Sequence, residues 1–316
     1  MYHEANGKQD DRSKQRKTAT LGGMLRSEAL TFLMEAHSGL SAKIVEEAGF
    51  KGIWASGLSI SASMAVPDRN EASWSQVLEV IEFMADATTI PILVDGDSGY
   101  GDHNNTRRLA VKLCERGAAG VCIEDKLFPK QNSFLGEGQK LLAISDFCDK
   151  IRASKDSVSD PDFCFVARTE TLIGGGSMQE ALDRAAAYHE AGADAILIHS
   201  KRSTAEEIVE FCRQWRQRCP VVIVPTKYHK TPTSVYRAAG VSTVIWANHS
   251  LRASIQAMQQ TVQRIYTEES IGALDDIIAP LEEVFRISGN DDSGAPQPAR
   301  SSVKPAAILA SAVGAG

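Results

Sequence analysis

ERGAAGVCIED (115–125) is the stretch that decides the fold, because a charged segment stops there at a glycine and an apolar run follows. Nearly the same phrase occurs as EEAGFKGI (46–53) and as HEAGADAIL (189–197). A glycine after a helical pattern is a common helix-stop signal, and a short apolar run bounded by turn residues is typical of a strand. The recurring phrase therefore predicts a repeated unit of helix, turn and strand.

Eight apolar runs of this kind lie between residues 29 and 249, with helical patterns between them. Their cores are continuous rather than alternating, as expected of parallel strands covered on both faces. The runs are ALTFLMEAH (29–37), KGIWASG (51–57), IPILVDGD (90–97), AGVCIED (119–125), DFCFVARTE (162–170), ADAILIHS (193–200), PVVIVPT (220–226) and STVIWANH (242–249). Eight such units predict an α/β fold of the (β/α)8 barrel type, and an open doubly wound sheet is the alternative.

The composition excludes several classes of protein. The 316 residues are 43% hydrophobic and 23% charged, which argues against a disordered chain, and the net charge of −6 does not favour a nucleic-acid partner. No apolar run approaches the ~18 residues that a membrane span needs. The six cysteines include no CxxC pair and the first residues have no apolar core, so we expect a cytoplasmic protein without a secretory signal.

Carboxylates gather where two neighbouring strands are expected to end. Asp95 and Asp97 follow one run and Glu124 ends the next, at the end of the barrel where active sites lie. Carboxylates this close repel one another unless a cation sits among them. Mg²⁺ is the natural choice, with Mn²⁺ as an alternative, and Asp68 can join from the preceding loop. The chain has no HxH, HExxH or cysteine pair that would favour zinc.

Two cationic side chains and one small-residue turn suggest an anionic small-molecule substrate. Arg168 and His199 end consecutive strands, and arginine suits a phosphoryl or carboxylate group because it donates two parallel hydrogen bonds. The backbone N–H groups of Gly57 and Leu58 are candidates to hold a carboxylate.

The segment EDKLFPKQNSFLGEGQK (124–140) forms a long polar connection before the next helix, expected near residue 143. Long loops in compact domains often act as lids. Lys130, Asn132 and Ser133 would then close over a bound substrate.

These motifs resemble a known family. EDKLFPKQNS (124–133) looks like the EDKxxxxxNS hallmark of the phosphoenolpyruvate mutases, in the isocitrate lyase superfamily. The resemblance extends over roughly residues 18–288. Its other segments include GIWASGLSISAS (52–63), VPDRNEASW (66–74), ILVDGDSGYG (92–101), FVARTE (165–170) and VIWANHSLRAS (244–254).

The resemblance implies an α/β barrel whose C-terminal helix is swapped between subunits of a homodimer or homotetramer. It implies that Asp95 binds Mg²⁺ directly, and that Asp97 and Glu124 act through metal-bound water. Ser56, Gly57 and Leu58 would hold the substrate carboxylate, with Trp54 nearby. Arg168 and His199 would contact the phosphoryl group, and Lys130, Asn132 and Ser133 would form the gating loop. Asp68 would be either a nucleophile or an anchor.

The implied reaction is the interconversion of phosphoenolpyruvate and phosphonopyruvate in phosphonate biosynthesis, an isomerase reaction that makes a C–P bond. C–P formation is uphill in this family, so a downstream enzyme must consume phosphonopyruvate. A phosphonopyruvate hydrolase, a C–C lyase of the same superfamily and a non-catalytic pathway scaffold are the alternatives. Asn132 in the lid argues against the hydrolase, and the absence of a cysteine between Cys122 and Cys148 argues against the lyase.

Three regions are expected along the chain: a disordered leader (1–18), a catalytic barrel (19–289) and a flexible tail (290–316). The tail contains DDSGAPQPARSS followed by VKPAAILASAVGAG. The last segment resembles the first strand and phosphate loop of a nucleotidyltransferase, so one interpretation of the tail is the remnant of a fusion junction. The other is a flexible, alanine-rich segment without a role of its own.

Overall fold

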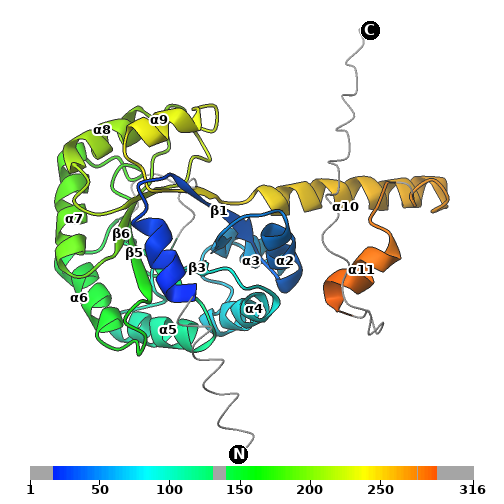
Figure 1. Ribbon diagram of the computed structural model, residues 1–316, viewed down its shortest axis with the longest axis horizontal. Coiled ribbons are helices and arrows are strands. Elements are labelled where there is room, and N and C mark those ends of the chain that lie inside the picture. Colours follow the sequence, from blue (N-terminus) through cyan, green and yellow to red (C-terminus); the bar gives the residue numbers. More distant parts are fainter. Residues whose placement is uncertain (1–16, 131–139, 276, 290–316) are drawn as a thin grey trace, which may run out of the picture. The chain divides into compact units, whose positions relative to one another are not determined.

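The structure of the protein is a computed structural model that describes residues 17–130, 140–275 and 277–289. Eight parallel strands pair in chain order and β8 pairs with β1, so the sheet closes into a barrel surrounded by helices (Figure 1). The strands are β1 (Thr31–Ala36), β2 (Ile53–Ala55), β3 (Ile92–Asp95), β4 (Gly120–Glu124), β5 (Cys164–Thr169), β6 (Ala195–Ile198), β7 (Val221–Ile223) and β8 (Thr243–Trp246). The predicted (β/α)8 barrel is confirmed, and each predicted run contains one strand.

The helices follow the strands in the order that the sequence pattern predicts. They are α2 (Gly39–Glu47), α3 (Gly57–Ser63), α4 (Trp74–Ala87), α5 (His103–Glu115), α6 (Ile144–Lys155), α7 (Met178–Glu190), α8 (Glu206–Trp215), α9 (Thr233–Ala238), α10 (His249–Glu268) and α11 (Leu281–Ser288). In the part of the chain that the structure describes, no helix is both long and apolar enough to cross a membrane.

The recurring phrase of the sequence ends three helices in the same way. Gly49, Gly117 and Gly192 follow α2, α5 and α7 and have φ values of 98°, 84° and 111°. Residues that carry a Cβ rarely adopt this left-handed backbone conformation, so glycine can end the helix there at a low cost in free energy. Each glycine thus turns the chain toward the strand that follows.

The barrel interior is filled by side chains and is not a channel. Its core includes Leu33, Trp54, Leu93 and Leu197 from the strands, all 2% exposed or less. A second core lies between the strands and the outer helices. Because both faces of every strand are covered, continuous apolar runs are required, as the sequence has them.

Residues 17–25 form a helix that contributes Leu21 to the interior core. A Cβ on Gly120 would lie 2.9 Å from Leu21 Cδ2, so glycine allows this helix to approach β4 closely. Lys17 and Thr18, which we assigned to the leader, are therefore helical. Lys17 Nζ donates to the carbonyl oxygens of Ala85 and Thr88 at 2.9 and 2.7 Å.

The chain divides into two compact units, with the boundary after residue 271. The first contains the barrel and α10, and the second contains α11. The predicted barrel range of 19–289 thus spans both units. The rest of the leader and the tail (290–316) lie outside the described residues, so the three-region division stays a prediction.

Candidate active site

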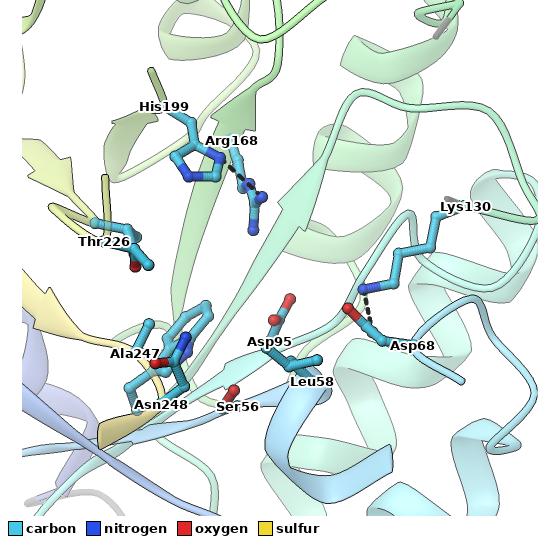
Figure 2. Close-up of a pocket in the computed structure, with 12 residues that line it drawn as sticks. Ser56, Leu58, Asp68, Asp95, Lys130, Arg168, His199, Thr226, Ala247 and Asn248 are labelled. Atoms are coloured by element: carbon cyan, nitrogen blue, oxygen red, sulfur yellow. Dashed lines mark hydrogen bonds and ion pairs between the residues drawn. The ribbon is translucent and has the colours of Figure 1, made fainter. Parts of the chain in front are cut away.

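A pocket opens at the C-terminal ends of the strands, and the pocket with its mouth encloses about 520 Å³. Strand ends on several sides of the barrel and two loops contribute to it (Figure 2). The lining residues are Trp54, Ser56, Leu58, Asp68, Asp95, Lys130, Arg168, His199, Val224, Thr226, Ala247 and Asn248. Eight of the predicted site residues are among them, although they come from segments far apart in the sequence.

Lys130 lies between two carboxylates at one side of this pocket. Its Nζ is 2.7 Å from Asp68 Oδ1 and 2.6 Å from Asp97 Oδ1. The side chains of all three residues are less than 10% exposed, and Figure 2 shows Lys130 reaching toward Asp68. The sequence predicted all three as site residues but not this ion-pair cluster.

Burial and charge set the protonation of this cluster. Burial raises the pKa of Asp97 to about 6, because desolvation and the nearby Asp95 and Asp68 outweigh the attraction of Lys130. Burial would lower the pKa of Lys130, but the carboxylates of Asp97 and Asp95 raise that pKa well above its ordinary value. Lys130 therefore stays protonated, and its positive charge compensates carboxylates that are buried away from solvent.

Asn70 joins the two ends of this cluster, and our sequence analysis missed it. Its Nδ2 donates to Asp97 Oδ2 at 2.8 Å, and its Oδ1 accepts from the backbone N–H of Lys130 at 2.7 Å. Asn70 adopts a positive φ of 63°, which asparagine tolerates better than most residues. The only signal in the sequence was its place two residues after Asp68, inside a segment that carries the family resemblance.

Asp95 is the carboxylate best suited to a metal ion. In the part of the chain that the structure describes, it forms no ion pair, and its oxygens accept only long hydrogen bonds of 3.3 Å from the N–H groups of Gly57 and Asp97. A Cβ on Gly57 would lie 3.2 Å from Asp95 Oδ2. Mg²⁺ usually binds one or two carboxylates and keeps several waters, so Asp95 fits a direct ligand.

Glu124 and Asp97 are already paired with cations. Glu124 Oε2 lies 3.4 Å from Arg168 Nη2, and burial raises the pKa of Glu124 to about 7 against the opposing effect of Arg168 and Lys126. Within residues 17–130, 140–275 and 277–289, no three His, Cys, Asp or Glu side chains are grouped to hold a metal ion. Asp97 and Glu124 therefore suit contacts to a metal through water, the role that the family resemblance implies for them.

Arg168 and His199 meet on the other side of the pocket, as the consecutive strand ends predicted. Arg168 Nη2 lies 3.0 Å from His199 Nδ1 (Figure 2). Glu170 Oε1 is 2.5 Å from Arg168 Nε and 3.0 Å from the same imidazole nitrogen. Burial lowers the pKa of His199, and Glu170 opposes this effect. Arg168 and His199 thus lie together at the pocket wall, an arrangement that suits an anionic ligand.

Ser56, Gly57 and Leu58, the turn after β2 that was expected to hold the substrate carboxylate, match that expectation only in part. Ser56 is the N-cap of α3, and its side chain accepts from the N–H of Ser59. The N–H of Gly57 donates to Asp95 Oδ2, so it is directed at this carboxylate rather than into the pocket. Trp54, Ser56 and Leu58 line the pocket, whereas Gly57 does not.

Several further residues complete the account of the site. Asn132 and Ser133 of the predicted lid lie outside the described residues. Thr226 and Asn248 also line the pocket. The sequence analysis assigned them no role, although both lie at the ends of predicted strand runs. Asp125, next to Glu124, instead accepts from Glu170 N and the hydroxyl group of Tyr188, which fixes the end of β4 from outside the pocket.

Comparisons with known proteins give a family match and several similar proteins. Residues 23–266 match the family model for phosphoenolpyruvate phosphomutase. The chain is 57% identical over 281 residues to phosphoenolpyruvate phosphomutase from Tetrahymena pyriformis, which covers 89% of this chain and 94% of the relative.

Two solved structures have the same fold. One is phosphoenolpyruvate phosphomutase from Streptomyces platensis subsp. rosaceus, with a TM-score of 0.85 and 43% identity, covering 87% of this chain and 96% of the other. The second is phosphonopyruvate hydrolase in complex with oxalate and Mg²⁺, with a TM-score of 0.82 and 39% identity, covering 87% and 95%.

Proposed function

Because this chain belongs to the phosphoenolpyruvate phosphomutase family, we infer that it interconverts phosphoenolpyruvate and phosphonopyruvate. It is an isomerase: a phosphoryl group moves within one molecule from the enol oxygen to the adjacent carbon, and a C–P bond replaces an O–P bond. The observation that carries this function is the 57% identity to a mutase over 89% of the chain, against 39% to the hydrolase.

The residues around the pocket have separate parts in this proposal. Arg168 and His199 hold the phosphoryl group, and the turn of Ser56, Gly57 and Leu58 beside Trp54 lies against the pyruvate moiety. The transferring group is metaphosphate-like, so catalysis depends on positioning and charge rather than on covalent help. Asp68, anchored by Lys130 at 2.7 Å, is held at the pocket wall, where a nucleophile or an anchor would be needed.

Asp95 would hold Mg²⁺, with Asp97 and Glu124 contacting its waters, and Mn²⁺ is the alternative. Once bound, the ion supplies positive charge for the enolate oxygen. Asp95→Asn should remove metal-dependent turnover while leaving the fold intact, whereas Asp86→Asn, at an exposed position of α4, should not. A Mg²⁺ titration of phosphonopyruvate turnover tests this role, and equal metal dependence in Asp95→Asn would contradict it.

The remaining features of the proposal concern the loop and the assembly. Lys130, Asn132 and Ser133 would close over the substrate and exclude water. We expect a cytoplasmic homodimer or homotetramer that shares a swapped C-terminal helix, and a downstream enzyme that consumes phosphonopyruvate.

A ³¹P NMR time course with phosphonopyruvate and Mg²⁺ tests the function. We expect the phosphonate signal to be replaced by that of phosphoenolpyruvate. Release of inorganic phosphate instead would mean that water captures the phosphoryl group, as in a hydrolase. An unchanged phosphonate signal would contradict the mutase assignment and leave the lyase and scaffold alternatives.

A further inference from the structure

Glu170 is a buried carboxylate that does not line the pocket but contacts Arg168 and His199, which do. It follows the last residue of β5 and is 1% exposed. Its Oε1 lies 2.5 Å from Arg168 Nε and 3.0 Å from His199 Nδ1, and its Oε2 lies 3.3 Å from Lys126 Nζ. Glu170 therefore acts on a ligand only through its neighbours.

The charge of Glu170 favours a proton on Nδ1 of His199. Burial would raise the pKa of Glu170, but Arg168 and His199 hold that pKa well below its ordinary range, so the carboxylate is ionised. An ionised carboxylate only accepts hydrogen bonds, so its contact with Nδ1 is a hydrogen bond only when Nδ1 carries the proton. Arg168 Nη2, 3.0 Å from Nδ1, is only a donor and favours the opposite tautomer, in which Nδ1 accepts, so Glu170 and Arg168 compete for the protonation of Nδ1.

With Nδ1–H directed at Glu170, His199 meets a ligand through Nε2. In the neutral ring Nε2 is an acceptor and would repel the oxygens of a phosphoryl group, which are also acceptors. In the imidazolium Nε2–H donates to them. The charged groups facing His199 are Glu170, which favours the imidazolium, and Arg168 and Lys126, which oppose it. A dianionic phosphoryl group entering beside Arg168 would shift this balance toward the imidazolium.

We propose that Glu170 is a positioning residue that orients His199 so that it binds the phosphoryl group as an imidazolium, taking up one proton from solvent as the substrate binds. The only bond formed in this step is Nε2–H, its proton comes from solvent, and no bond of the substrate is broken. The inference rests on the proposed function, because that function makes the ligand a phosphoryl compound.

Calorimetric binding of phosphoenolpyruvate with Mg²⁺, in buffers of different ionisation enthalpy at pH 8, tests the proposal. We expect the wild type to take up about one proton, because an unperturbed histidine is largely neutral at that pH. Glu170→Gln keeps an acceptor for Nδ1–H but removes the charge, so the uptake should disappear. Affinity at pH 8 should fall about tenfold, corresponding to one pKa unit at His199, and the loss should shrink as the pH is lowered.

Two controls separate this role from a structural one. Glu210→Gln removes an exposed carboxylate that pairs with Arg213, and it should behave as wild type. Oxalate with Mg²⁺ carries no phosphoryl group, so it should bind wild type and Glu170→Gln with equal affinity and without proton uptake.

The ring itself can be observed without any variant of Glu170. Spectra of ¹⁵N-histidine in the wild type, with the His199 signals assigned from His199→Asn, should show a neutral ring alone and an imidazolium with phosphoenolpyruvate. A ring that stays neutral, or equal proton uptake in wild type and Glu170→Gln, would overturn the proposal. If phosphonopyruvate is still converted to phosphoenolpyruvate, such a result leaves the function intact.

Discussion

At the scale of single residues, the pocket is defined by how its buried charges are balanced. Lys130 compensates Asp68 and Asp97 on one side, and Arg168 compensates Glu124 and Glu170 on the other. Removing one member of a buried pair leaves an uncompensated charge, which costs about 3–5 kcal/mol. Each of the two cations must therefore stay paired with its carboxylates if the pocket is to retain its shape.

Asn70→Ala tests whether the amide that bridges Lys130 and Asp97 organises this pocket. Loss of both hydrogen bonds leaves a buried backbone N–H and a carboxylate oxygen short of a partner, at about 1–3 kcal/mol each. We expect kcat/KM for phosphonopyruvate to fall by roughly ten- to a hundredfold, with the fold retained by circular dichroism. Asn104→Ala, at an exposed position of α5, should behave as wild type, and an unchanged kcat/KM in Asn70→Ala would contradict the role.

Lys150 provides a test of buried charge away from the pocket. It is 2% exposed, and its Nζ donates to the carbonyl oxygen of Ser98 at 2.6 Å. Burial lowers its pKa to about 8, from an ordinary value of 10.5, although Asp102 and Asp146 oppose the shift. The folded protein therefore binds this proton more weakly than the unfolded chain does. The resulting cost is fully present below pH 8 and declines as the pH rises toward 10.5.

Lys150→Met should accordingly stabilise the protein relative to wild type more at pH 7 than at pH 10. The difference in the free energy of unfolding between Lys150→Met and wild type should shrink by about 2–3 kcal/mol from pH 7 to pH 10, because one pKa unit corresponds to ~1.4 kcal/mol. Urea unfolding at both pH values measures this, with the exposed Lys140→Met as the control. A difference that does not depend on pH would refute the assignment.

Single residues differ in how far the sequence could predict them. Arg168 and His199 were predictable as a pair, because consecutive parallel strands place their ends side by side. The contact of Lys130 with Asp97 was not, because it depends on the path of two loops and on an Asp97 backbone at a φ of 52°. Glu170 was visible as a strand-end acid, but only the packing reveals that it faces Arg168 and His199 rather than the pocket.

At the scale of elements, the turn from helix to strand is the feature that makes the barrel repeat. Gly192 has a φ of 111°, and the nearest atom to a Cβ placed there is Lys155 Cγ at 3.7 Å. Gly192→Ala therefore meets no clash, and its cost comes from the backbone alone. We expect a loss of about 1–2 kcal/mol in the free energy of unfolding with KM unchanged.

Gly23→Ala is the matched control, because Gly23 lies in the helix of residues 17–25 and a Cβ there meets nothing within 4 Å. Alanine should stabilise that helix by about 0.5–1 kcal/mol. Equal effects of the two substitutions in urea unfolding would show that the positive φ is not what requires glycine at residue 192.

Elements were largely predictable because this fold uses a continuous apolar run for each strand and a glycine after several helices. Capping residues add to the signal, since Ser38, Ser73 and Asp102 begin α2, α4 and α5 with side-chain hydrogen bonds. Lys17 and Thr18 were assigned to the leader although they are helical, because these polar residues give no apolar periodicity.

At the scale of the whole molecule, α10 carries an apolar stripe that its own barrel leaves exposed. Ile255, Met258 and Val262 are 39%, 57% and 66% exposed, and Leu251 is the buried residue of this helix. Their spacing places them on one helical face, as expected of a surface that packs against another element. This stripe supports the proposed homo-oligomer with a swapped helix.

Val262→Glu should weaken this assembly, because a buried unpaired carboxylate is costly in an interface. Light scattering after size exclusion should show a smaller species for Val262→Glu and no change for Gln260→Glu, which adds the same charge on the opposite face of α10. A wild type that is already monomeric would contradict the proposed assembly.

The central claim for the molecule is that the phosphoryl group is transferred within one substrate molecule. Its most direct test is a crossover experiment. Unlabelled phosphonopyruvate is mixed with phosphonopyruvate that carries ¹³C in the pyruvate skeleton and ¹⁸O on phosphorus, and the phosphoenolpyruvate formed is analysed by mass spectrometry. We predict only unlabelled and doubly labelled product. Product with one label alone would show that a phosphoryl group had been transferred from one substrate molecule to the pyruvate moiety of another. That result would contradict the account.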